Sequence, residues 1–360
     1  MNPPVNPPTT PRPLVILGMF DLTRLKAAMA VRIHNLHLAL QPLTPTLLLS
    51  GSRKTRSQAV RQFLRQGGLS QTRAIYVEAS TSAANPSDLW FLWQAHRAGI
   101  PIVIFIPDGY QLFPEIFPRV GLKVKLLDWG WQISLRLYQR TADCLLFPSQ
   151  GLADCFPNRP FTALLPPGGL ASRPQSPITW HPPTISYMGG TSYRYGSDLL
   201  LEAMAQVVTV YPEARCLFIS HESSYLDSHP HRRAPWLTVT QADFTQLPEM
   251  MAQTSVTVIP LRQNRYNNLA VPVKLFDYIS FGRPVVATAC QETAHWIERL
   301  GCGLLCQDNA QELAQGIIHL LQNRSQAEAM GQAGYNAVQN EHSWPHRAAA
   351  LWQIITKLTL

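Results

Sequence analysis

Short apolar runs alternate with segments of helical periodicity along nearly the whole chain. In the first half the apolar runs are 14–18, 46–50, 74–79, 102–106 and 144–147. In the second half they are 184–188, 216–220, 236–239, 255–260 and 285–287. Helical spacing covers 25–40, 52–66, 89–98, 122–140, 197–211, 244–252, 310–322, 326–339 and 344–360. This alternation predicts an α/β protein with doubly wound parallel sheets, whose ligands bind beyond the carboxyl ends of the strands.

A proline-rich segment divides this alternation into two halves. Residues 166–183 hold six prolines and little periodicity, which is typical of a linker. A chain of 360 residues is long enough for two domains of ordinary size. We therefore predict two Rossmann-like domains. The expected divisions are a lead-in at 1–13, an N-terminal domain at 14–170, a linker at 171–183, a C-terminal domain at 184–342 and a last helix at 343–360.

Positive charge is concentrated in the first half of the chain. Residues 1–175 hold 18 Lys and Arg against 8 Asp and Glu, whereas residues 176–360 hold 12 against 14. The imbalance indicates an anionic partner such as a membrane surface, a phosphorylated substrate or nucleic acid, with a basic face that serves only solubility as the alternative. No recognised nucleic-acid motif accompanies the charge, so we expect no nucleic-acid partner.

The predicted helix at 52–66 is a candidate for contact with an anionic membrane. A narrow apolar stripe on this helix lies beside five basic residues, a pattern shared by membrane-surface helices and ordinary surface helices. The basic residues are Arg53, Lys54, Arg56, Arg61 and Arg65.

The sequence predicts a cytoplasmic protein, with peripheral contact at the inner face of the plasma membrane as an option. No apolar run reaches the length of about 18 residues that a membrane-spanning helix needs. The lead-in lacks the apolar core of a signal peptide. The six cysteines show neither a disulfide framework nor zinc spacing, so we expect reduced thiols.

The stretch 268–288 combines a loop, a short helix and a buried strand. Pro272 suits the first turn of a helix, where the N–H group that proline lacks has no partner in any case. Gly282 suits a left-handed helix end, and the run 285–287 follows as a strand. The free N–H groups at the Pro272 end form an anion site, to which Lys274 adds a positive charge. A plain helix–strand unit without a ligand is the alternative.

Polar residues follow several predicted strands of the N-terminal half. Asp108 lies in a Pro-Asp-Gly-Tyr turn, Asp21 and Arg24 follow the first strand, and Glu78 lies near the end of the third. Groups in such places reach the ligand cleft of a doubly wound sheet, which makes Asp108 a candidate catalytic residue. Turn formation by the Asp-Gly pair is the alternative.

Several motifs, in this order, resemble those of GT-B glycosyltransferases of family 4 and of relatives that build bacterial surface polysaccharides. The family has Pro-x-Lys, an aromatic residue and Glu-Tyr, followed by Gly-x-Pro-Val-Val. The chain has Pro272-x-Lys274, then Phe276-Asp277-Tyr278, and then Gly282-x-Pro284-Val285-Val286. Supporting similarities are Pro107-Asp108, the strand that ends in Ser149, Pro167-Gly168, Gly189-Gly190, Gly196-x-Asp198 and Ser343-Trp344.

The resemblance implies a GT-B fold, in which two Rossmann-like domains face each other across a cleft and the last helix crosses back to the N-terminal domain. It implies transfer of a sugar from a nucleoside diphosphate-sugar to a hydroxyl of a glycan or lipid-linked acceptor, in polysaccharide or glycolipid synthesis. The donor would bind the C-terminal half and the acceptor the N-terminal half. The nucleotide sugar is a co-substrate, and no metal ion or other cofactor is expected.

The resemblance also assigns residues to roles. Lys274, with Arg194 or Arg265, would stabilise the leaving diphosphate, and Asp277 would accept from the ribose hydroxyls. If the reaction inverts the anomeric centre, Asp108 would be the base, with Asp21 and Glu78 as the next candidates; if it retains it, Asp108 would position substrate. The expected donor site is Gly189, Gly190, Arg194, His221, Arg265, Asn268, Val271, Pro272, Val273 and Asp277, and the expected acceptor site is Asp21, Arg24 and Glu78.

Three positions depart from the family pattern. Leu269 stands where the family often has a first glutamate, and Asp277 is one methylene shorter than the second. Tyr195 stands where the family has a lysine, although Arg194 is adjacent. These departures leave open a second hypothesis, in which a catalytically inactive GT-B protein binds nucleotide or glycan as an assembly or regulatory subunit.

Overall fold

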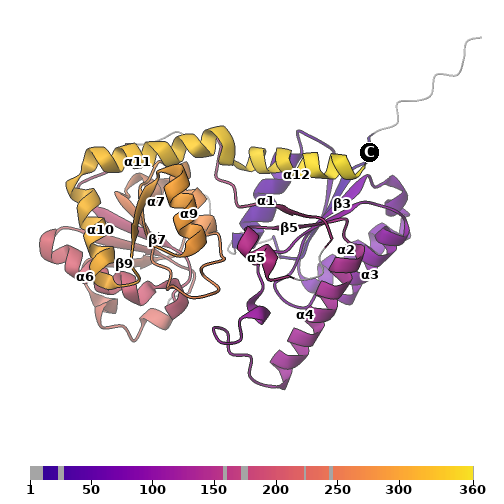
Figure 1. Cartoon of the computed structure of the whole chain (residues 1–360), viewed down its shortest axis with the longest axis horizontal. Coiled ribbons are helices and arrows are strands. Elements are labelled where there is room, and N and C mark those ends of the chain that lie inside the picture. Colours follow the sequence, from indigo (N-terminus) through magenta and orange to yellow (C-terminus); the bar gives the residue numbers. More distant parts are fainter. Residues whose placement is uncertain are drawn as a thin grey trace, which may run out of the picture.

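The protein consists of two α/β domains that lie side by side (Figure 1). The computed structural model describes residues 11–22, 28–156, 160–171, 177–222, 224–242 and 246–359. Most of the predicted lead-in and residues 172–176 of the predicted linker lie outside these residues. Each domain is built on one parallel six-stranded sheet, as the alternation of strands and helices predicts.

The N-terminal sheet has the strand order β2-β1-β3-β4-β5-β6. Its central strands are fully buried because helices cover both faces of the sheet. The strands are β1 (Leu14–Gly18), β2 (Thr46–Leu49), β3 (Ala74–Glu78), β4 (Ile102–Phe105), β5 (Cys144–Phe147) and β6 (Thr162–Leu164). The helices are α1 (Ala28–Leu40), α2 (Arg53–Arg65), α3 (Pro86–Arg97), α4 (Leu122–Thr141) and α5 (Gln150–Asp154).

The C-terminal sheet has the order β12-β11-β10-β7-β8-β9. Its strands are β7 (Thr184–Met188), β8 (Arg215–Ile219), β9 (Leu237–Thr240), β10 (Val256–Ile259), β11 (Val285–Thr288) and β12 (Gly303–Cys306). Its helices are α6 (Ser197–Val210), α7 (Leu247–Ala252), α8 (Val273–Ser280), α9 (Gln291–Leu300), α10 (Ala310–Gln322) and α11 (Arg324–Ala337). The sequence pattern missed β6 and β12, which are partly exposed edge strands without a continuous apolar run, and it missed α5 and α9.

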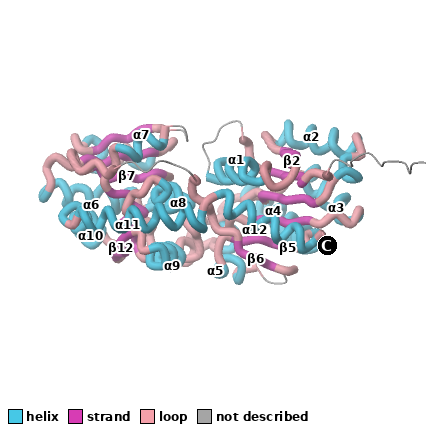
Figure 2. The backbone as a smooth tube through the Cα atoms, turned by 90° about the horizontal axis from the view of Figure 1, so that it is seen from above, coloured by secondary structure: helices cyan, strands magenta, loops and turns pink. Residues whose placement is uncertain are grey.

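The chain crosses between the domains twice, and the two crossings lie together. The N–H group of Gly169 donates to the carbonyl of His342 at 2.8 Å, and the N–H group of Trp344 donates to the carbonyl of Gly169 at 3.0 Å. After a π-helical turn at Val338–His342, α12 (Trp344–Leu358) packs on α1 of the N-terminal domain. Figures 1 and 2 show α11 on one domain and α12 on the other, along one side of the molecule.

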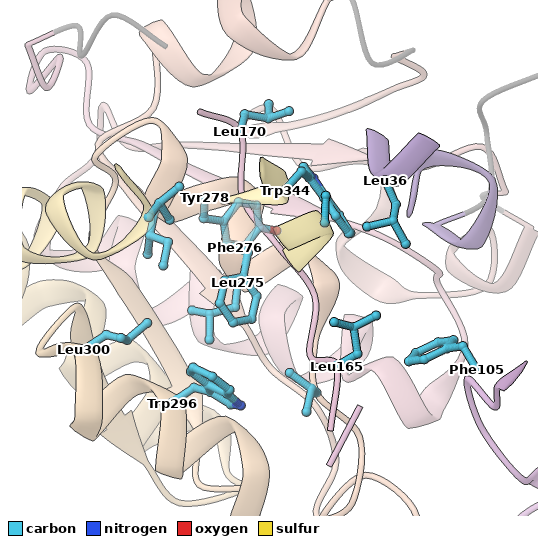
Figure 3. Close-up of a cluster of buried hydrophobic side chains, with 14 of the residues drawn as sticks. Leu36, Phe105, Leu165, Leu170, Leu275, Phe276, Tyr278, Trp296, Leu300 and Trp344 are labelled. Atoms are coloured by element: carbon cyan, nitrogen blue, oxygen red, sulfur yellow. The ribbon is translucent and has the colours of Figure 1, made fainter. Parts of the chain in front are cut away.

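One hydrophobic cluster joins the two domains. It contains Leu36 and Phe105 of the N-terminal domain, Phe276 and Trp296 of the C-terminal domain, and Trp344 of α12. Figure 3 shows Trp344 between Leu36 and Phe276. The core is therefore continuous across the domain boundary, which fixes one edge of the cleft.

The structure changes the interpretation of the basic helix at 52–66. The apolar stripe of α2 packs into the N-terminal core, and the guanidinium of Arg56 is buried against Asp88 at 2.9 Å. This helix therefore has no free apolar face for a membrane. Exposed apolar side chains lie instead on α4, at Leu122, Leu126 and Trp129. In the part of the chain that the structure describes, no helix is both long and apolar enough to span a membrane.

Candidate active site

A cavity of about 490 Å³ lies between the two domains. The C-terminal domain contributes the loops that follow β7 and β8, together with the first turn of α8. The N-terminal domain contributes Ala28, Val31 and Tyr110. The cavity therefore lies at the carboxyl ends of the C-terminal strands, where a doubly wound sheet binds its ligand.

The amino end of α8 borders this cavity. Pro272 is the N-cap of the helix and has no N–H group, and no side chain of the described residues caps the helix. The N–H groups of Val273 and Lys274 have no carbonyl partner within the helix, because they belong to its first turn. Gly282 ends this segment with a φ of 66°, as its sequence position predicts. The first turn of α8 therefore presents partial positive charge to a ligand in the cavity.

Lys274 places its side-chain amine at the same site. Its Nζ lies 4.2 Å from the centre of the Tyr187 ring and has no hydrogen-bond partner among the described residues. Burial lowers the pKa of Lys274 to about 7, and the charge of Asp277 raises it. An anion beside Nζ would favour the charged form of this lysine.

Gly189 makes room for the lysine. A Cβ atom at this position would lie 2.5 Å from Nζ of Lys274 and 2.9 Å from the hydroxyl of Tyr187. Its φ of 147° also favours glycine. The absence of a side chain at Gly189 therefore leaves the space that Nζ of Lys274 occupies.

Asp277 lies one turn after Lys274 and is 7% exposed. Burial raises its pKa to about 7, and the charge of Lys274 lowers it. The next residue, Tyr278, accepts a hydrogen bond from the N–H group of Met188 at 2.7 Å and so ties α8 to the end of β7. A carboxylate in this place can accept from the hydroxyls of a ligand.

Arg194 reaches across the cleft. Its guanidinium lies 4.5 Å from the ring of Tyr195, and 5.0 and 5.5 Å from the rings of Phe117 and Tyr110 in the N-terminal domain. The ring of Tyr195 fills the space beside Gly190, where a Cβ would meet it at 2.3 Å. Tyr195 therefore has an aromatic packing role, and Arg194 carries the charge at this edge of the cavity.

Asp108 lies in a second, smaller cavity of about 110 Å³. This cavity adjoins the larger one, since Val271 and Val273 line both. Oδ1 of Asp108 is buried without a hydrogen-bond partner among the described residues. Burial raises the pKa of Asp108 to about 7, while a hydrogen bond from Tyr110 and the charge of Arg194 lower it. The carboxylate thus has the proton affinity of a base that works near neutral pH.

Most of the predicted donor residues line the larger cavity. They are Gly189, Gly190, Arg194, His221, Val271, Pro272, Val273 and Asp277, and Lys274, the predicted catalytic residue, lines the cavity with them. Two others do not. The Asn268 side chain accepts from the N–H group of Gln291, and Asn267 lines the cavity in its place. Arg265 is exposed outside both cavities, with its Nη1 3.9 Å from Glu115.

The predicted acceptor residues do not form a site together. Glu78 is fully buried, so it cannot touch an acceptor; its carboxylate instead accepts from Nε of Arg32 and from the hydroxyl of Tyr76. Asp21 is exposed and lines neither cavity. Arg24 lies outside the described residues.

Sequence reasoning missed an interdomain contact centred on Tyr266. The ring of Tyr266 lies 5.1 Å from that of Tyr110 and 4.9 Å from that of Phe117. Leu269 belongs to the same loop, and its carbonyl accepts from the hydroxyl of Ser149 at 2.7 Å. These loops have no periodicity, so no sequence signal indicated that they meet.

Arg32 was also missed, although a signal existed. It lies four residues before Leu36 and eight before Leu40, on the buried face of α1. A cation on the apolar face of a helix indicates a buried partner.

Comparisons with known proteins find similarity to glycosyltransferases. Residues 182–323 match the family described as Glycosyl transferases group 1. A GDP-mannose-dependent monoacylated alpha-(1-6)-phosphatidylinositol monomannoside mannosyltransferase of Corynebacterium glutamicum is 24% identical over 281 residues, 72% of this chain and 71% of that protein.

Two solved structures share the fold over nearly the whole chain. Sucrose-phosphate synthase from Thermosynechococcus elongatus has a TM-score of 0.73 at 17% identity, over 96% of this chain and 99% of that one. Alr3699/HepE of Anabaena, in complex with UDP and glucose, has a TM-score of 0.70 at 13% identity, over 96% and 100%.

Proposed function

The chain has the GT-B fold and is similar to the family 4 glycosyltransferases, and on this premise we propose that it transfers a sugar from a nucleoside diphosphate-sugar to an acceptor hydroxyl. The observation that carries the proposal is the uncapped first turn of α8 with Nζ of Lys274 at the interdomain cavity. Relatives support the donor class, since HepE has a structure with UDP-glucose and the Corynebacterium mannosyltransferase depends on GDP-mannose.

In the reaction, the bond between the anomeric carbon and the diphosphate oxygen breaks, and the acceptor oxygen bonds to that carbon. The leaving diphosphate gains negative charge, which the N–H groups of Val273 and Lys274, the Lys274 ammonium and Arg194 stabilise. Asp277 accepts hydrogen bonds from the ribose hydroxyls. The acceptor proton passes to Asp108 in an inverting reaction, or to the departing diphosphate in a retaining one. None of these steps uses a metal ion.

A panel of nucleotides tests the donor site. We expect UDP, GDP or ADP, and the corresponding nucleotide sugars, to stabilise the protein against thermal unfolding, because a ligand that binds only the folded state adds about 2.7 kcal/mol at a hundred times its Kd. The matched nucleoside monophosphates are the control, since they lack the phosphate that would reach Lys274.

The outcomes separate two functions. Stabilisation by a diphosphate together with hydrolysis or transfer of its sugar supports a glycosyltransferase. Stabilisation without turnover of any donor favours the alternative, a catalytically inactive GT-B subunit. No stabilisation by any member of the panel contradicts the glycosyltransferase and leaves only a subunit that binds glycan.

The acceptor is, in this proposal, a glycan or a lipid-linked molecule at an anionic membrane surface. The first turns of α4 expose Leu122, Leu126 and Trp129, with Lys123 and Lys125 exposed between them. Figure 1 shows α4 extending from the N-terminal domain on the side away from α11 and α12. Apolar side chains flanked by lysines suit the boundary of an anionic bilayer, where each basic residue adds roughly 1 kcal/mol.

Vesicle flotation tests this surface. We expect the protein to float with vesicles that contain anionic lipid. The double variant Leu126→Asp/Trp129→Asp should lose most of this binding, because a carboxylate does not insert into the bilayer and is repelled by anionic lipid. Val210→Asp, at an exposed apolar position of α6, is the matched control. Equal recovery of the wild type with neutral and anionic vesicles would remove the membrane from the proposal.

A further inference from the structure

Arg32 of α1 is buried beside the smaller cavity with most of its hydrogen-bonding capacity unused. The residue is 1% exposed, and its Nε donates to the two carboxylate oxygens of Glu78 at 3.0 and 3.3 Å. Its guanidinium carbon lies 3.7 Å from the centre of the Phe105 ring. Among the described residues, neither Nη1 nor Nη2 has a hydrogen-bond partner of ordinary geometry, although the nearby hydroxyl of Tyr76 interacts with the guanidinium. Burial lowers the pKa of Arg32, and Glu78 and Tyr76 raise it. Buried polar groups are nearly always paired, so this guanidinium indicates a ligand.

The surroundings of Arg32 carry more positive than negative charge. Arg347 of α12 donates from Nε to the carbonyl of Pro167 at 2.9 Å, and Pro167 lines the same cavity as Arg32. Burial lowers the pKa of Arg347, and the nearby charge of Arg32 lowers it further. Against these two arginines stands the carboxylate of Glu78. Asp108, the other acidic group at the cavity, is partly protonated near neutral pH because burial raises its pKa to about 7.

We propose that the smaller cavity is an anion subsite, in which Nη1 and Nη2 of Arg32 bind a carboxylate or phosphate carried by one of the two substrates. The planar fork of a guanidinium matches two oxygens of such a group. A cavity of about 110 Å³ accommodates a group of this size. The subsite rests on the proposed function, because it adjoins the donor cavity through Val271 and Val273.

The subsite also gives a physical reason for Leu269. This side chain lines the smaller cavity and packs against α5, since a Cβ atom on Gly151 would lie 2.7 Å from it. A glutamate here would place a negative charge in the cavity and repel the bound anion. Leucine keeps the cavity free of that charge.

The anion has two sources, the donor sugar and the acceptor. A uronic acid in the donor would bring a carboxylate, and a sugar phosphate acceptor would bring a phosphate. Matched pairs of probes distinguish them. UDP-glucuronate with UDP-glucose and GDP-mannuronate with GDP-mannose test the donor, and glucose 6-phosphate with glucose tests the acceptor.

The experiment measures the Kd of each probe by calorimetry, for the wild type and for two variants. We expect the anionic member of at least one pair to bind the wild type at least about tenfold more tightly than its neutral twin. Arg32→Lys keeps the ion pair with Glu78 but loses the planar fork, so it should lower this preference about tenfold. Leu269→Glu leaves Arg32 unchanged and should abolish the preference by repulsion. Arg73→Lys is the matched control, because Arg73 lines neither cavity. Its guanidinium carbon lies 4.7 Å from the centre of the Trp352 ring.

Equal binding of both members of every pair by the wild type would overturn the subsite. An anion preference that survives in both Arg32→Lys and Leu269→Glu would also overturn the role of Arg32. These results differ from failure of the proposed function, which would appear as no binding of any nucleotide sugar. In that case the glucose 6-phosphate pair still tests the subsite directly.

Discussion

Lys274→Met is expected to lower kcat/KM for the nucleotide sugar by about 10²–10³-fold, because it removes the preorganised positive charge that stabilises the leaving diphosphate. Methionine has a similar length, so the packing against Tyr187 is kept while the cation is lost. The substitution should also reduce the thermal stabilisation by nucleoside diphosphates. Steady-state kinetics with the donor selected by the nucleotide panel measures the first effect.

A matched variant separates this effect from a general loss of lysine. Lys54→Met changes an exposed lysine on α2, outside both cavities, and should leave kcat/KM unchanged. Wild-type kinetics in Lys274→Met would show that the Lys274 ammonium does not stabilise the leaving diphosphate, and this role of Lys274 would then be wrong.

Asp108→Asn is expected to lower kcat by about 10²–10⁴-fold if this carboxylate takes the proton of the acceptor. Burial raises the pKa of Asp108 to about 7, so the basic form is lost as pH falls through 7. The wild-type rate should therefore rise with pH up to about 7 and then level off, and the residual rate of the variant should lack this step. A pH profile of both proteins at saturating acceptor measures the effect.

The same experiment separates the two stereochemical courses. Near-wild-type turnover of Asp108→Asn at saturating acceptor would exclude the role of base. An increase in KM for the acceptor with an unchanged kcat would indicate that Asp108 only positions substrate, as in a retaining reaction.

The sequence determined the features that depend on neighbouring residues. The alternation of apolar runs and helical segments was enough to predict two parallel α/β domains, because strand and helix periodicities are local. The clustering of four predicted site residues follows for the same reason. Val271, Pro272, Lys274 and Asp277 lie within seven residues on one loop and helix, so helical geometry alone brings them together.

Only the tertiary structure decided which polar groups are buried and what they face. Glu78 and Asp108 both lie at the carboxyl ends of N-terminal strands, yet Glu78 is sealed beneath Arg32 whereas Asp108 lines a cavity. The helices α2 and α4 differ in the same way. Both are basic in sequence, but packing buries the apolar side chains of α2 and leaves those of α4 exposed.

The unpaired guanidinium of Arg32 and the apolar contact of Leu269 also required the fold, since both depend on segments far apart in the chain. The burial of a group, and with it the pKa of that group, depends on all the segments that pack around it. Local sequence specifies the group itself but not its surroundings.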